Sequence, residues 1–274
     1  MRNKLFGKAL PYFILVIIGI VFLLPLLWVV VASLDTNASI ILKLPAHPSL
    51  QNFITVVSKR SNTHAFAIGL VISIFQTLFV VIVAGLSAYP LSRYQLRFKK
   101  IFMYTILFMA SLPITAVMIP VYEEFVMINL YDSVFGVILF MTASSLPYAI
   151  WLMKNFMDSV PLELEEAAMV DGASALQSLV HIVIPLMVPG IFTVAVFTFS
   201  GSWGNFFVPF ILLTSAGNLP ASVQLYQFFG MHGLIAYGPL AAYSILYAIP
   251  SILLYALSQN YMSKGFSMQG ATKG

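Results

Sequence analysis

Six long uncharged windows constrain the fold of this chain more than any other feature of its sequence. Each window is mainly apolar, lacks Asp, Glu, Lys and Arg, and reaches the roughly 20 residues that an α-helix needs to cross a bilayer. The windows are residues 11–34, 65–92, 101–122, 134–153, 186–213 and 235–262. Because a backbone in lipid must satisfy its hydrogen bonds internally, we expect an all-α membrane protein with six transmembrane helices.

The composition supports this interpretation. Of the 274 residues, 60% are hydrophobic and 8% are charged, whereas a soluble domain usually carries roughly a quarter charged residues. The chain has no cysteine, which excludes disulfides and thiolate metal sites. Its first window is too long for the core of a signal peptide, so we expect a retained first span. Residues 1–274 are therefore predicted to form a single transmembrane domain.

Lys and Arg lie unevenly on the two sides of the windows. With the N-terminus in the cytoplasm, the opposite side carries Lys43, Lys59 and Arg60, and the cytoplasmic side carries the other ten. Those ten are Arg2, Lys4, Lys8, Arg93, Arg97, Lys99, Lys100, Lys154, Lys264 and Lys273. The positive-inside rule predicts that both termini face the cytoplasm, and it also explains the basic net charge without a nucleic-acid partner.

Residues 160–185 form a cytoplasmic segment that cannot lie in lipid, because it contains Glu163, Glu165, Glu166 and Asp171. Pro161 suits a first helical position, and glutamates in the first turns complement the helix dipole. A left-handed glycine at Gly172 is expected to end this helix.

A second helix is predicted to follow directly after Gly172. Ser174 and Gln177 have capping-box spacing, and Pro185 is expected to mark the boundary with the next span. One face of this helix carries four apolar residues, Leu176, Leu179, Val180 and Val183.

The segments on the opposite side differ in character. Residues 35–64 are predicted to form an extracytoplasmic loop, with a short surface helix at 53–57. Residues 123–133 are short and acidic. Residues 214–233 are uncharged and rich in Gly, Gln and aromatic residues, so we expect them to dip into the membrane or to line a cavity.

The chain lacks the sequence features with which a membrane protein uses an ion gradient or binds ATP. Residues 172–263 contain no Asp, Glu, Lys or Arg, which argues against a carrier driven by ions. No P-loop is present; the nearest imitation, residues 265–270, has Ala271 at the position of the required lysine and is interpreted as a flexible tail. Any ATPase must therefore be a separate chain.

The sequence also lacks the pattern of an enzyme. The histidines, His47, His64, His181 and His232, fall in different segments without a paired ligand, so we expect no metal site. Serines within the windows have no partner base, which argues against an intramembrane enzyme. We expect no catalytic residue in this chain.

A spaced pattern within residues 160–185 resembles a known family motif. Glu166, Ala167 and Ala168 are followed after three residues by Gly172, and after nine more by I-x-I-P at residues 182–185. This is similar to the EAA loop of ABC importer permeases, E-A-A-x3-G-x9-I-x-L-P, with isoleucine in place of leucine at residue 184. Residues 162–174, residues 202–206 with an inserted glycine, and the glycine-rich residues 265–274 resemble the MalG-like subunit of carbohydrate importers.

The resemblance implies a type I importer permease with the MetI-like fold, N-in and C-in, in the cell membrane. It implies a second, MalF-like permease, two copies of a cytoplasmic ATPase that bind ATP and Mg²⁺, and an extracytoplasmic solute-binding protein. This chain itself would bind no cofactor. The EAA loop (residues 160–185) would dock on the ATPase through Glu163, Glu166, Ala167, Ala168, Asp171 and Gly172, although Glu163 and Glu165 also fit a solvated helix face.

The solute implied by the resemblance is a sugar or a polyol. Sugars are bound by aromatic faces and neutral hydrogen-bonding groups. The candidates for the substrate path are therefore Trp203, Asn205, Gln76, Ser144, Ser145 and Tyr148. Helix packing is the alternative role for each of these residues, and the alternative functions are a stand-alone secondary carrier and an importer permease for a solute other than a sugar.

Overall fold

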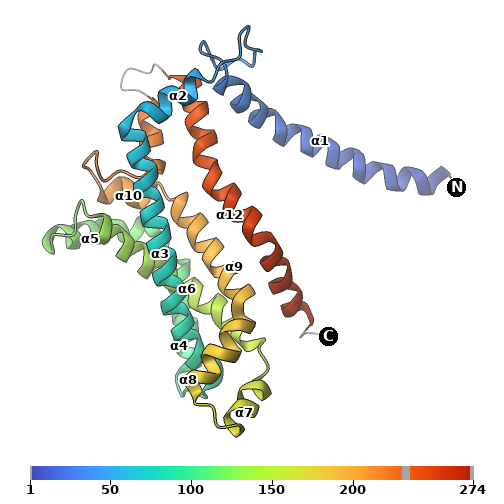
Figure 1. Ribbon diagram of the computed structural model, residues 1–274, viewed down its shortest axis with the longest axis vertical. Coiled ribbons are helices and arrows are strands. Elements are labelled where there is room, and N and C mark those ends of the chain that lie inside the picture. Colours follow the sequence, from blue (N-terminus) through green and yellow to red (C-terminus); the bar gives the residue numbers. More distant parts are fainter. Residues whose placement is uncertain (1, 230–234, 272–274) are drawn as a thin grey trace. The chain divides into compact units, whose positions relative to one another are not determined.

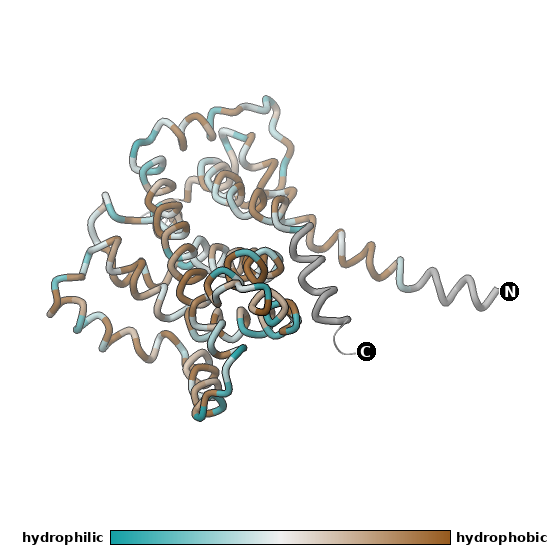
Figure 2. The backbone as a smooth tube through the Cα atoms, turned by 60° about the horizontal axis from the view of Figure 1, so that its bottom comes forward, coloured by the Kyte–Doolittle hydropathy of each residue, from teal (hydrophilic) through white to brown (hydrophobic). Residues whose placement is uncertain are grey.

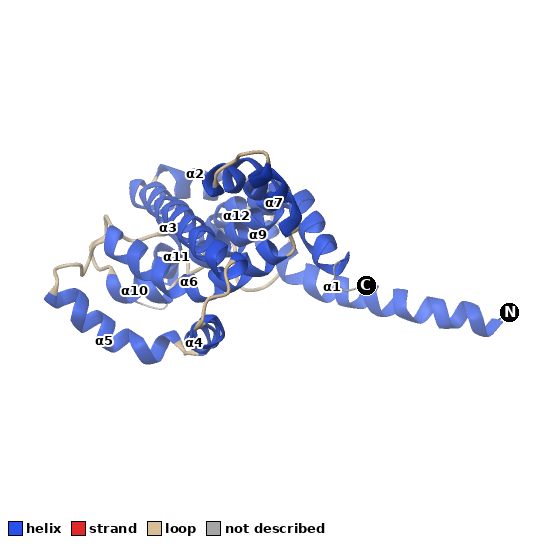
Figure 3. Cartoon of the chain, turned by 90° about the horizontal axis from the view of Figure 1, so that it is seen from below, coloured by secondary structure: helices blue, strands red, loops and turns tan. Residues whose placement is uncertain are grey.

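The computed structural model describes residues 2–229 and 235–271, with the side chains of residues 11–229 and 235–259. Within these ranges every regular element is a helix (Figure 3), which confirms the predicted fold class. The predicted segments 214–233 and 264–274 lie partly outside the described residues, and His232 lies wholly outside them.

Five helices among the described residues are long and apolar enough to cross a membrane. They are α1 (Arg2–Ser33), α3 (Arg60–Arg93), α6 (Val134–Asp158), α9 (Ile184–Trp203) with the turns that precede it, and α12 (Tyr237–Ala271). Hydrophobic residues dominate long stretches of these helices (Figure 2), as lipid-facing surfaces require. α12 includes most of the residues predicted to form a flexible C-terminal tail.

The third predicted span is bent rather than continuous. α4 (Lys99–Ser111) and α5 (Ile114–Met127) meet at 91°, so they form either one broken span or a re-entrant pair. The bend lies at Leu112, which is extended (φ −69°, ψ 132°) because the following Pro113 disfavours a helical residue before it. A count of apolar residues cannot detect this bend, since both halves are apolar.

The fifth predicted span, 186–213, is also divided. α9 ends at Trp203, and the short α10 (Phe207–Leu212) begins after Gly204, Asn205 and Phe206. Asn205 directly precedes the N-cap residue Phe206, and its Oδ1 accepts a hydrogen bond at 3.1 Å from the backbone N–H of Val208, one of the N–H groups that the first turn of α10 leaves unpaired.

The chain divides into two compact units, residues 1–64 with 224–249 and residues 65–223 with 250–274. In the first unit, α2 (Gln51–Ser58) contains residues 53–57, which were predicted to form a short surface helix. Its buried Asn52 donates hydrogen bonds to the carbonyls of Ser33 and Asp35, at 3.0 and 2.9 Å. Asn62 and Gln224 of this unit are hydrogen-bonded to each other at 3.2 Å.

The core of the second unit lies where α3, α6 and α9 pack together (Figure 1). Ala84 and Ala88 are fully buried on α3, and such small residues let membrane helices approach closely. Gly190 of α9 serves the same purpose, because a Cβ there would lie 2.6 Å from the side chain of Phe156 on α6. This packing places one face of each of the three helices around a common pocket.

Candidate functional site

The EAA loop folds as a helix, a glycine elbow and a second helix, as its sequence predicts. The first helix, α7 (Leu162–Val170), ends in a turn where Gly172 has φ +93°. The Gly172 N–H donates to the Met169 carbonyl at 3.1 Å, and the Ala173 N–H to the Ala168 carbonyl at 2.9 Å. This pair of bonds is a Schellman motif. No atom lies within 4 Å of a Cβ built on Gly172, so the need for glycine comes from the backbone conformation.

The second helix, α8 (Ala175–Ser178), begins with the predicted capping box. The Gln177 N–H donates to Ser174 Oγ at 3.3 Å, and the Ser174 N–H donates to Gln177 Oε1 at 2.8 Å. Pro185 lies in the first turn of α9, which begins at Ile184 near the predicted boundary, but the π-helix η1 (Leu179–Val183) connects α8 to α9 without a break in the helix. A proline lacks an N–H and crowds the preceding turn, and the wider π turn directly before Pro185 accommodates this.

The outer face of the EAA loop combines acidic and apolar side chains in water. Glu163, Glu166, Ala167, Asp171 and Gly172 are exposed, and Ala168 is partly buried. Beside them two large apolar side chains are 87% (Val170) and 70% (Leu176) exposed. An apolar surface of this kind, on a segment too charged to enter lipid, is typical of a protein contact.

Glu165 differs from its neighbours because it is only 1% exposed. Its Oε1 lies 2.5 Å from Arg93 Nε at the end of α3, and its Oε2 accepts a hydrogen bond from Tyr89 at 3.2 Å. The solvated helix face considered for Glu165 is therefore wrong. One side of α7 packs against the rest of the unit, and Glu165 is the carboxylate on that side.

Further polar contacts connect the same ends of the helices. Arg93 donates to the carbonyl of Val160 at 3.1 Å, which joins α3 to the start of the EAA loop. Ser92 donates to Asp158 at 2.6 Å, and Asp158 also pairs with Lys154 one turn earlier on α6. The loop is thus attached to α3 and α6 by charged groups as well as by the chain itself.

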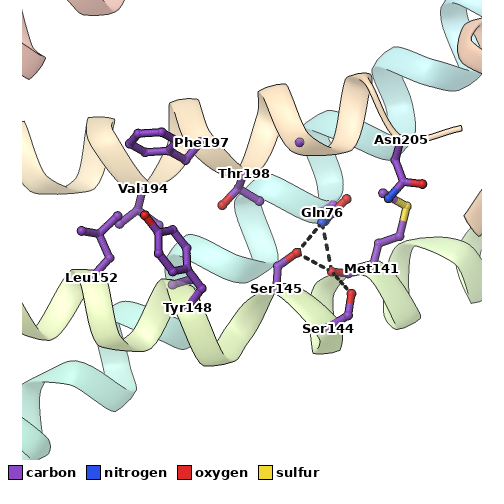
Figure 4. A pocket seen from close by; sticks show the side chains of 12 residues that line it. Gln76, Met141, Ser144, Ser145, Tyr148, Leu152, Val194, Phe197, Thr198 and Asn205 are labelled. Atoms are coloured by element: carbon purple, nitrogen blue, oxygen red, sulfur yellow. Dashed lines mark hydrogen bonds between the residues drawn. The ribbon is translucent and has the colours of Figure 1, made fainter. Parts of the chain in front are cut away.

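A pocket of about 300 Å³ lies between α3, α6 and α9 (Figure 4). Five of the six residues predicted for a substrate path line it: Gln76, Ser144, Ser145, Tyr148 and Asn205. The other lining residues were not predicted, because most of them are apolar residues like those elsewhere in the spans: Met141, Ala149, Leu152, Val194, Phe197, Thr198 and Gly201. None of these described residues carries a formal charge, and the size fits the lower end of small-molecule sites.

Trp203 is not among the residues that line the pocket. It is buried, and its ring stacks on Phe66 and Phe199 with centroids 6.4 and 6.3 Å away. A Cβ on Gly69 would lie 3.0 Å from the same ring. This position favours helix packing over solute contact, the two roles that the sequence left open for Trp203.

Gln76 is the most buried polar group in the pocket, at 2% exposure. Its amide nitrogen donates to the Met141 carbonyl and to Ser145 Oγ, both at 3.0 Å. The same Met141 carbonyl accepts from Ser145 at 2.7 Å and from Ser144 at 3.1 Å. The pocket wall is therefore held together by a small neutral network that joins α3 to α6.

At the other end of the unit, Asp132 ties the turn before α6 to the segment after α10. Its Oδ1 accepts the N–H groups of Thr214 and Ser215 at 2.9 and 3.0 Å, and its Oδ2 accepts the Ser215 hydroxyl. Burial alone would raise the pKa of Asp132, but these hydrogen bonds and one from Asn218 lower the pKa to about 2. The carboxylate is therefore held in its charged form.

No group of three or more His, Asp or Glu side chains among the described residues is arranged to hold a metal ion.

Comparison with known proteins gives consistent matches. Residues 81–264 match the family described as binding-protein-dependent transport system inner membrane component. The inner membrane ABC transporter permease protein YcjP of Escherichia coli is 32% identical over 214 residues, covering 76% of this chain and 74% of that protein. The trehalose/maltose transport system permease protein MalG of Thermococcus litoralis is 25% identical over 283 residues, covering all of both chains. A chain of a bacterial ABC transporter that imports the acidic polysaccharide alginate has the same fold, with a TM-score of 0.84 and 22% identity, over 95% of this chain and 98% of that one.

Proposed function

The chain belongs to the family of binding-protein-dependent transport system inner membrane components, and from this membership we propose that it forms half of a solute path driven by a separate ATPase. It is a multi-pass membrane protein and a permease subunit of an ABC importer. The partners proposed for it are a MalF-like second permease, an ATPase dimer that binds ATP and Mg²⁺, and an extracytoplasmic binding protein.

The observation that carries the coupling proposal is the two-sided character of α7. Its outer side presents Glu166, Ala167 and the exposed Val170, while its inner side holds Glu165 in the buried pair with Arg93. A helix that is exposed on one side and held by an ion pair on the other can transmit the movement of a bound partner to the transmembrane helices. We place the ATPase on the outer side, where small alanines permit close approach and Glu166 offers a charged contact.

The solute proposed for this importer is a neutral sugar or polyol. The pocket between α3, α6 and α9 provides hydroxyl and amide groups together with the aromatic rings of Tyr148 and Phe197, which suit a hydroxyl-rich ligand. The names of the relatives that transport trehalose, maltose or alginate support a saccharide. An importer permease for another neutral solute is the alternative. A secondary carrier is not favoured, because the residues that line the pocket include no charged group.

Co-purification tests the coupling proposal. We expect this chain, co-expressed with its sister permease and ATPase, to form a stable complex that takes up solute only with ATP. The Glu166→Gln variant should insert into the membrane normally, but less ATPase should co-purify with it. The matched control is Glu123→Gln, because Glu123 is an equally exposed glutamate on α5, outside the EAA loop. Equal ATPase recovery for both variants, or uptake without ATP, would contradict the coupling role.

A further inference from the structure

The pocket contains a hydrogen-bond acceptor that the described residues leave unused. Gln76 Oε1 is buried and makes no hydrogen bond to any described residue, although the amide nitrogen of the same side chain makes two. Buried polar atoms in folded proteins are almost always paired, so an unpaired one requires an explanation. Because Gln76 lines the pocket, a bound molecule can supply the missing partner.

The neighbours of Gln76 determine which atom of its side-chain amide, the oxygen or the nitrogen, has no hydrogen-bond partner. The Met141 carbonyl can only accept hydrogen bonds, so the group 3.0 Å from it must be the NH₂ of Gln76. A flipped amide would place two oxygens against each other at that distance. Figure 4 shows this nitrogen turned toward Ser145 and Met141. The open position is therefore an acceptor, and it needs a donor.

Ser145 cannot be this donor. Its hydroxyl has one proton, which goes to the Met141 carbonyl at 2.7 Å, and its oxygen accepts from Gln76. Ser144 likewise donates to Met141. The hydroxyl protons of these two serines are thus committed to the backbone, which leaves Gln76 Oε1 as an unused acceptor in a residue of the pocket wall.

We propose that Gln76 Oε1 accepts a hydrogen bond from a hydroxyl group of the transported solute, and that the uncharged lining around it makes the pocket selective for neutral, hydroxyl-bearing solutes over acidic ones. The proposal rests on the proposed function and extends it to one residue and one atom. The hydroxyl groups of an acidic sugar could donate to Gln76 Oε1 as those of a neutral sugar do, but its carboxylates find no Lys or Arg among the lining residues to pair with their charge. The alginate importer with the same fold handles an acidic polysaccharide, so selectivity against acids would be a property of this chain's own side chains.

The test uses the complete importer in proteoliposomes, with uptake of radiolabelled maltose, trehalose and digalacturonate as probes. We expect the wild type to take up a neutral probe and to exclude digalacturonate. Gln76→Met keeps the length of the side chain but removes the acceptor together with the NH₂ group that bonds Met141 and Ser145, and it should lower uptake of the neutral probe about tenfold. The matched control is Ser73→Ala, since Ser73 is also buried on α3 but does not line the pocket, and uptake by this variant should be unchanged.

A second measurement, on the wild type, tests the proposal even if the Gln76→Met variant does not assemble. Monodeoxy analogues of the transported sugar are compared, with uptake corrected for each analogue's affinity for the binding protein. One analogue should be transported about tenfold more slowly than the parent, because it lacks the donor for Gln76. In Gln76→Met this difference should disappear.

The outcomes separate the two proposals. Equal uptake of all deoxy analogues or undiminished uptake by Gln76→Met would overturn the role of Gln76. Uptake of digalacturonate alone would overturn the proposed selectivity, and each of these results would leave the importer function intact. ATP-dependent uptake of none of the three saccharides would overturn the proposed saccharide function, and the role of Gln76 with it.

Discussion

Arg93 Nε and Glu165 Oε1 lie 2.5 Å apart with both side chains buried, and this contact joins the end of α3 to the first helix of the EAA loop. The two atoms form an ion pair rather than an aligned hydrogen bond. Glu165 also accepts a hydrogen bond from Tyr89, and Arg93 donates to Ser92 Oγ and to the Val160 carbonyl. α3 also carries Gln76 in the pocket wall. A displacement of α7 can therefore be transmitted to α3 through this ion pair, in addition to the covalent connection of α7 to α9 through α8.

The buried ion pair makes a first prediction about stability. Glu165→Ala leaves the Arg93 guanidinium buried without its counter-charge, which should cost about 3–5 kcal/mol. Thermal unfolding of the solubilised complex should show a lowered midpoint. The double variant Arg93→Met/Glu165→Met should be less destabilised than Glu165→Ala, because no unpaired charge remains. The exposed Glu163→Gln on the same helix serves as the control and should unfold like the wild type.

Gly172 leads to a second prediction, about coupling. Its φ of +93° is accessible to glycine, but a β-branched residue there is strained by at least about 1 kcal/mol, and the relief of that strain would misdirect α8. Gly172→Val should keep membrane insertion and ATP hydrolysis but lose most uptake, whereas Gly172→Asn should retain more. Gly85→Ala is a suitable control, because that glycine has open space around it and no positive φ. Normal uptake by Gly172→Val would argue against the coupling role.

Asp132 provides a pH-dependent prediction. The native pKa of about 2 lies below the ordinary value of 3.8, so the carboxylate stabilises the native turn above about pH 4 and loses this contribution as the pH falls toward 2. Asp132→Asn keeps an acceptor for Thr214 or Ser215 but loses the charge, and it should unfold at a lower temperature than the wild type at pH 7. This difference should shrink steadily when the unfolding is followed below pH 4. A constant difference over that range would show that the charge of Asp132 is not responsible.

Trp203 allows a test that separates packing from solute contact. Replacing a buried tryptophan by alanine should cost about 3–5 kcal/mol of stability through the cavity it leaves. Trp203→Phe, which keeps an aromatic ring against Phe66 and Phe199, should restore most of the stability. Because Trp203 does not line the pocket, the KM for uptake by Trp203→Phe should equal that of the wild type. A raised KM with normal stability would place Trp203 on the solute path.

The predictions that the structure confirms rest on local chemistry. The glycine elbow at Gly172 and the capping box of Ser174 and Gln177 involve residues a few positions apart, so the spacing of residue types specifies them. Five of the six residues predicted for a substrate path line one pocket, and their contact with a solute stays a prediction. The sequence did not reveal how continuous the helices are: Pro113 follows a bend of 91° in the third window, while the π-helix before Pro185 continues into α9.

The helical class and the helix, glycine elbow and helix of the EAA loop could be predicted from the sequence, because they follow from hydrophobic length and short-range hydrogen bonding. The packed structure was needed to show which glutamate of α7 is buried, since Glu165 is distinguished by Arg93, a partner 72 positions away, and not by its neighbours in the sequence. The same holds for Gln76: its type marks it as a hydrogen-bonding residue, but the fold decides that Met141 and Ser145 occupy its nitrogen and that its buried oxygen has no partner among the described residues. Contacts between distant segments depend on how the helices pack, and packing is a property of all their faces together.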